Sequence, residues 1–134
     1  MTIPVPSVFW SFETEAPIDK CLVCAGDLIG SGEAYMIEKA FSQGEVIFEY
    51  GICSACHTAM MQELSAQSLK LIQNYFEEHV DVAARRSRIR SGFDGGVLPW
   101  ISRCMFTGKP VVEADHYQIL GMCVGDELLL GDLP

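Results

Sequence analysis

Cys21-Leu22-Val23-Cys24 and Cys53-Ser54-Ala55-Cys56 are the two short stretches that decide the fold of this chain. In a Cys-x-x-Cys turn, both sulfur atoms reach the same side of a tight loop, where they bind one tetrahedral ion at about 2.3 Å. Two such turns complete a shell of four thiolates. The spacing therefore predicts one structural Zn²⁺ held by Cys21, Cys24, Cys53 and Cys56, with redox or disulfide use of these cysteines as the alternative.

The residues around each pair favour the metal site. Ala25 and Gly26 follow Cys24, and small residues suit the sharp turn of a metal-binding knuckle. The second pair stands where a long helix is expected to begin. Both of its thiols are therefore expected on the first helical turn, near the exposed N–H groups and the positive end of the helix dipole, which favour thiolates.

Two β-prone runs lie between the cysteine pairs. They cover residues 35–41 and 45–50, and Ser42-Gln43-Gly44 separates them with a length and composition typical of a hairpin loop. Apolar and polar residues alternate in the second run. Its buried face is expected to carry Val46, Phe48, Tyr50 and Ile52.

The order of knuckle, hairpin and cysteine-bearing helix resembles the treble-clef zinc finger, over about residues 20–80. The resemblance implies a metal-bearing scaffold and leaves the function open, because treble clefs serve in nucleic-acid binding, protein binding and nuclease sites. A nuclease of the His-Asn-His type is disfavoured, because residues 35–52 contain no histidine to act as its general base.

Residues 54 to about 84 are expected to be helical. Apolar residues recur there at steps of three or four, but the step from Leu64 to Leu69 breaks the register. Ser65 is a suitable cap for a second helix at this point. The pattern predicts either one kinked helix or two helices in sequence.

The fold class predicted from these elements is α+β, a treble-clef-like finger with a β-rich C-terminal lobe. Residues 20–91 are expected to form the finger with its helix. Residues 92–134 begin with a glycine-rich joint and are expected to form the lobe, with strand candidates at residues 111–112, 117–124 and 128–130.

Residues 1–19 are expected to form an extended arm, because prolines recur in this segment and disfavour a helix. The arm also carries Phe9, Trp10 and Phe12. These aromatic side chains are expected to pack onto the domain, with a docking tail for a partner as the alternative.

The charge of the chain bears on its partners. The formal net charge is −9, from 9 basic and 18 acidic residues, and such a surface repels nucleic acid as a whole. One basic island interrupts it, formed by Arg85, Arg86, Arg88 and Arg90. We interpret the island as a complement to a helix C-terminus and to the protein's own acids; a patch for phosphate or an acidic partner is the alternative.

Residues 104–110 have the shape of another knuckle, with Thr107 where a second cysteine would stand. Cys104, His116 and Cys123 offer at most three good ligands, and threonine is a poor one. We therefore expect a metal-free turn, with both cysteines as small buried side chains.

The start of the chain has no basic segment followed by an apolar run, and no stretch is long enough to span a membrane, so a cytoplasmic location is expected. The sequence then predicts a zinc-binding protein with a structural metal and no enzymatic activity. Its expected function is protein–protein interaction, and the alternative is nucleic-acid binding through the four arginines.

Overall fold

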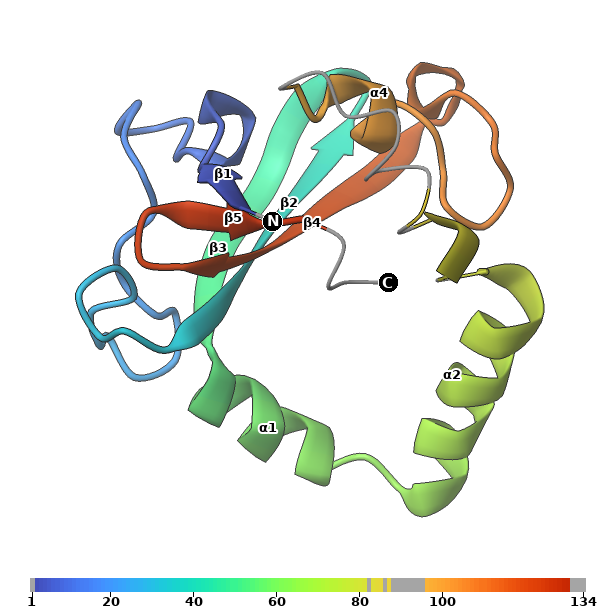
Figure 1. The fold of residues 1–134 in the computed structure, drawn as a ribbon, viewed down its shortest axis with the longest axis horizontal. Coiled ribbons are helices and arrows are strands. Elements are labelled where there is room, and N and C mark those ends of the chain that lie inside the picture. Colours follow the sequence, from blue (N-terminus) through green and yellow to red (C-terminus); the bar gives the residue numbers. More distant parts are fainter. Residues whose placement is uncertain (1, 82, 86, 88–95, 131–134) are drawn as a thin grey trace.

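A five-stranded antiparallel sheet organises the computed structural model, which describes residues 2–81, 83–85, 87 and 96–130 (Figure 1). The strand order is β1-β5-β4-β2-β3. The strands are β1 (Thr2–Pro4), β2 (Ala34–Ser42), β3 (Glu45–Cys53), β4 (His116–Val124) and β5 (Glu127–Leu129). The helices are α1 (Ser54–Gln62), α2 (Ala66–His79) and α4 (Leu98–Ile101), with 3-10 turns η1 (Ser7–Phe9) and η2 (Val111–Glu113). The fold is thus a mixture of helix and sheet.

The predicted hairpin is present as β2 and β3. Its loop places Gln43 and Gly44 at positive φ, 52° and 83°. The expected burial of Phe48 is wrong, because this side chain is 44% exposed. Since β3 is the end strand of the sheet, it has a paired neighbour on one edge only.

The centre of the sheet is formed by strands far apart in sequence. β2 pairs with β4 along its whole length, from Ala34 opposite Val124 to Ser42 opposite His116. The sheet therefore joins strands from the arm, the finger and the C-terminal segment; the division of the chain into these three parts stays a prediction. The prediction of a strand at residues 111–112 is wrong, because a 3-10 turn begins there directly after Pro110.

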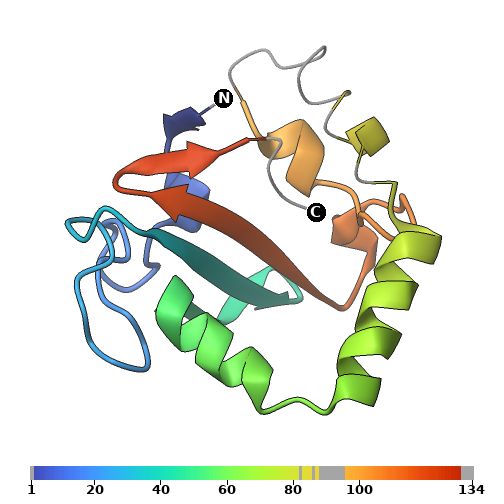
Figure 2. The ribbon, with the colours of Figure 1, turned by 60° about the horizontal axis from the view of Figure 1, so that its bottom comes forward.

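The helical stretch divides into two helices at the break in its apolar pattern (Figure 2). The Oγ atom of Ser65 accepts a hydrogen bond from the N–H group of Ser68 at 3.0 Å, so Ser65 caps α2. The α2 helix ends at His79, and the described residues 83–85 and 87 are again helical. Among the described residues, no helix combines the length and the apolar composition needed to cross a membrane.

The core lies where the arm covers the sheet. Phe9 is 1% exposed, and a Cβ atom on Gly121 of β4 would stand 3.0 Å from the Phe9 ring. A glycine at this position therefore lets the aromatic ring approach the strand closely. Phe12, three residues later in the same arm, is 71% exposed. The expected packing of the arm is confirmed for Phe9 and wrong for Phe12.

Replacing Phe9 by alanine should lower the free energy of unfolding by about 3–5 kcal/mol, because it leaves a cavity in the core. Phe12→Ala is the matched control, with an expected change within about 0.5 kcal/mol, since its side chain is exposed. Chemical denaturation followed by circular dichroism measures both. Equal losses in the two variants would contradict this assignment of the core.

Candidate metal centre

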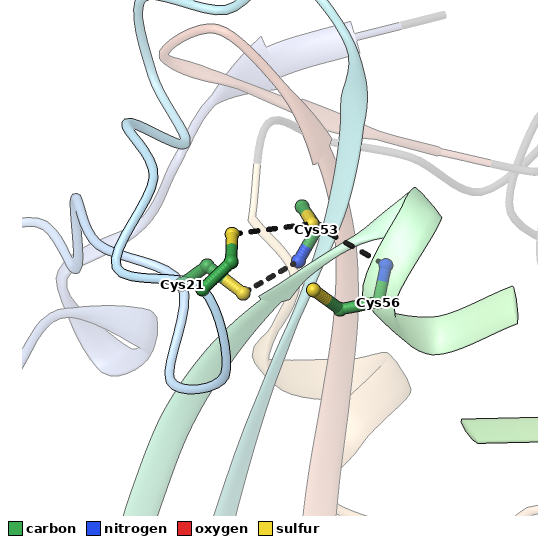
Figure 3. Close-up of side chains that lie close together, drawn as sticks. Cys21, Cys53 and Cys56 are labelled. Carbon is green, nitrogen blue, oxygen red and sulfur yellow. Dashed lines mark hydrogen bonds between the residues drawn. The ribbon is translucent and has the colours of Figure 1, made fainter. Parts of the chain in front are cut away.

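Four cysteines from three parts of the fold converge on one point. Figure 3 labels three of them, Cys21, Cys53 and Cys56. Cys21 and Cys24 come from the loop before β2, Cys53 ends β3, and Cys56 lies in the first turn of α1. All four sulfur atoms lie within 4.8 Å of one another. The Cys24 and Cys53 sulfurs are 3.9 Å apart. This separation is too long for a disulfide bond and close to the roughly 3.8 Å edge of a tetrahedral thiolate shell around one ion.

Main-chain hydrogen bonds shape the first knuckle. The N–H group of Cys21 donates to Gly26 O, and that of Ala25 donates to Cys21 O, both at 2.9 Å. Ala25 has a φ of 60°, the left-handed conformation that tightens the turn. A Cβ atom on Gly26 would lie 3.2 Å from the Cys24 sulfur. The small residues expected after Cys24 therefore leave room for its thiol.

The knuckle is anchored on the outer edge of β3. The N–H group of Leu22 donates to Gly51 O at 2.9 Å, and Cys21 forms a parallel bridge with Gly51. A Cβ atom on Gly51 would stand 2.5 Å from Leu28 Cδ1. This role of Gly51 was not predicted from the sequence, although a glycine within an apolar run is the signal that indicates such a close approach.

The second cysteine pair is shaped by the start of α1. Cys53 is the N-cap of this helix, and its sulfur accepts a hydrogen bond from the N–H group of Cys56 at 3.4 Å. The N–H group of Cys53 in turn donates to the Cys21 sulfur at 3.5 Å (Figure 3). Only Cys56 lies on the first turn itself. Both bonds stabilise negative charge on sulfur.

The four thiols differ in acidity. Burial raises the pKa of the Cys21 thiol, but hydrogen bonds from the main chain of Cys24, Cys53 and Val23 outweigh it and lower the pKa to about 6. The hydrogen bond to the Cys53 thiol, followed by burial, raises the pKa of Cys56 to about 12. At neutral pH the metal-free cluster therefore combines a thiolate with a protonated thiol, and binding of a metal must displace protons.

The turn at residues 104–109 repeats the main-chain geometry of the first knuckle. The N–H group of Cys104 donates to Lys109 O at 2.9 Å, and that of Gly108 donates to Cys104 O at 2.8 Å. Gly108 has a φ of 74°, like Ala25 at the same place in the first turn. Thr107 stands where Cys24 stands, and its Oγ1 atom accepts a hydrogen bond from the N–H group of Lys109.

This second turn does not gather metal ligands. The cluster of Cys21, Cys24, Cys53 and Cys56 is the only group of three or more candidate ligands in the part of the chain that the structure describes. Cys123 is fully buried in β4, whereas His116 is exposed at the other end of that strand. Cys104 is only partly buried, so it was wrongly expected to be a buried side chain.

The predicted arginine patch is described only in part. A guanidinium N–H group of Arg85 donates to Trp100 O at 3.4 Å. Arg86, Arg88 and Arg90 lie outside the described residues, so the patch stays a prediction.

Comparisons of the chain with protein-family models, with curated proteins and with solved structures gave no match. The assignment of the site therefore depends on its geometry and on the chemistry of its four sulfur atoms.

Cys24→Ser should abolish stoichiometric metal binding, because it removes one of four clustered sulfurs. Cys104→Ser is the matched control and should keep the metal content of the unchanged protein. Elemental analysis of the purified variants measures both. Loss of metal from Cys104→Ser, or full metal content in Cys24→Ser, would contradict the assigned ligand set.

Metal affinity should fall as the pH falls, because protons compete for the sulfurs. Cys21 is a thiolate above about pH 6 and takes up a proton below it. The decrease of log affinity per pH unit should therefore become steeper below about pH 6. Competition with a chromophoric chelator across this range measures the slope, and a constant slope would contradict the lowered pKa of Cys21.

Proposed function

We propose that Cys21, Cys24, Cys53 and Cys56 hold one Zn²⁺ as a structural centre, in a treble-clef arrangement. The observation that carries the proposal is the convergence of the four sulfurs within 4.8 Å. The order of elements also supports it, since the knuckle is followed by the β2–β3 hairpin and then by α1 with its N-cap cysteine.

The donor set favours zinc in a structural role. Soft thiolate ligands in a four-membered set are typical of structural zinc, and four of them fill a tetrahedral shell. No coordination position then remains for a substrate or for a water molecule that attacks it. We therefore propose no catalytic role for the ion and no enzymatic activity at this centre.

The ion would cross-link the knuckle to β3 and α1. The two residues between its cysteines contribute little apolar burial, because Leu22 and Val23 are 69% and 65% exposed. The knuckle loop thus buries little apolar surface of its own at this point. Metal binding is expected to supply much of the free energy that holds the knuckle against β3 and α1.

We further propose that the protein acts by binding another protein. Exposed apolar side chains support this role, because patches of this kind mark interaction sites. They lie on α1, α2 and the segment between them (Met60, Leu64, Leu71, Ile72 and Tyr75) and around β3 (Phe12, Leu22, Ile47 and Phe48). The net charge of −9 disfavours nucleic acid as the partner.

Removing the metal with a chelator should lower the melting temperature by roughly 10 °C or more, because the free energy of metal binding is lost. Adding Zn²⁺ back should restore it, and Cys104→Ser should respond in the same way as the unchanged protein. Differential scanning calorimetry with metal analysis of each sample measures the change. An unchanged melting temperature in fully metal-free protein would exclude a structural role.

A further inference from the structure

A groove of about 490 Å³ lies beside β3, between this strand and the N-terminal arm. Three separate segments line it: the arm with Phe12, the knuckle with Leu22, and β3 with Ile47. These three apolar side chains are 71%, 69% and 57% exposed. Apolar groups from distant parts of the sequence therefore surround one open space that the described chain leaves unfilled.

The outer edge of β3 forms the floor of this groove. Within the described residues, only Gly51 of β3 forms a main-chain hydrogen bond on this outer edge, and the donor is the N–H group of Leu22. Because main-chain groups of a strand alternate between its two edges, Glu49 presents its N–H and C=O groups to the same outer side as Gly51. A strand edge of this kind is a template for pairing with an extended segment.

The arm contacts β3 here through a side chain. The N–H group of Phe12 donates to the Glu49 carboxylate at 2.8 Å, and Ser11 Oγ donates to it at 3.0 Å. Lys39 holds the same carboxylate in place through an ion pair of 3.3 Å. The arm therefore bonds to the side chain of Glu49, and no described residue donates to or accepts from the outer main-chain groups of Glu49.

The charge around the groove indicates the chemistry of an occupant. Glu13 and Asp19 line it, Glu45 begins the strand edge, and none of these acids forms an ion pair within the described residues. Lys20 is the one basic residue in the lining. Two copies of this chain, each with a net charge of −9, would repel each other at such a surface.

We infer that the groove beside β3 binds an extended, basic and apolar segment of a partner protein, which adds as a strand to the outer edge near Glu49. Its apolar side chains contact Phe12, Leu22 and Ile47, and its lysine or arginine side chains face the acids at the rim. The inference rests on the proposed function, because the knuckle that would bind the metal carries Leu22. The same knuckle occupies the outer edge of β3 at Gly51, so the unpaired part of this edge stops there.

A short fluorescent peptide of alternating lysine and valine tests this inference on the full chain, with fluorescence anisotropy as the readout. The peptide should bind, and the same peptide methylated on every backbone nitrogen should not, because it has no N–H groups to donate to β3. In amide hydrogen exchange, the N–H group of Glu49 should become protected when the peptide binds. Absence of binding, or equal binding of the methylated peptide, would overturn the inference.

Variants locate the peptide on the surface. Phe12→Ala and Leu22→Ala should each weaken binding about fivefold or more, as is usual for apolar contacts at the centre of an interface. Two control variants remove side chains of similar exposure outside the groove lining: Val23→Ala on the same knuckle and Leu71→Ala on α2. Both variants should bind the peptide as the unchanged protein does. Equal losses in all four variants would overturn the assignment.

Two further measurements separate this inference from the metal proposal. Metal analysis of every sample shows whether a binding defect comes from a lost ion. Protein that holds one Zn²⁺ and does not bind the peptide would refute the groove alone, whereas metal-free protein that folds and binds the peptide would refute the structural metal. Sedimentation that reveals a dimer disrupted by Phe12→Ala would make a second copy the occupant and would overturn the choice of partner.

Discussion

The close approach of two main-chain segments at Gly51 is the constraint on which the cysteine cluster depends. A Cβ atom at this position would stand 2.5 Å from Leu28 Cδ1 and 3.1 Å from Ile18 Cγ2. Because Gly51 has no side chain, Leu28 and Ile18 pack directly against the strand at this point. Beside it, the N–H group of Leu22 donates to Gly51 O, and the N–H group of Cys53 donates to the Cys21 sulfur. The absence of a side chain at Gly51 thus leaves room for the segment before β2 to pack beside the strand that ends in Cys53.

A buried ion pair fixes the arm on the same strand. Lys39 is 5% exposed, and its ammonium group is bonded to Trp10 O at 2.7 Å and to the Glu49 carboxylate at 3.3 Å. Removal of either partner would leave an uncompensated charge inside the fold. The strand β3 is therefore held by a metal-binding cluster near its C-terminal end and by a charge-assisted network near its middle.

Local patterns in the sequence were sufficient to predict the clustering of the four cysteines and the break between the helices. Cysteine spacing determines which sulfurs can meet, and Ser65 caps α2 through atoms only three residues away. The pairing of β2 with β4 was not predictable, because strand propensity does not name the neighbouring strand. The exposure of Phe48 was not predictable for the same reason, since alternation along a strand does not reveal that the strand lies at the edge of the sheet.

The turn at residues 104–109 has a consequence for how the metal centre assembles. It adopts the knuckle conformation with one thiol and no second metal ligand, so this conformation does not require a second cysteine. By the same chemistry, Cys21 and Cys24 are presented as a preorganised pair, and the N-cap of α1 presents Cys53 and Cys56 as another. An ion bound by the four cysteines would therefore join two preformed pairs, with little conformational entropy left to lose within either pair.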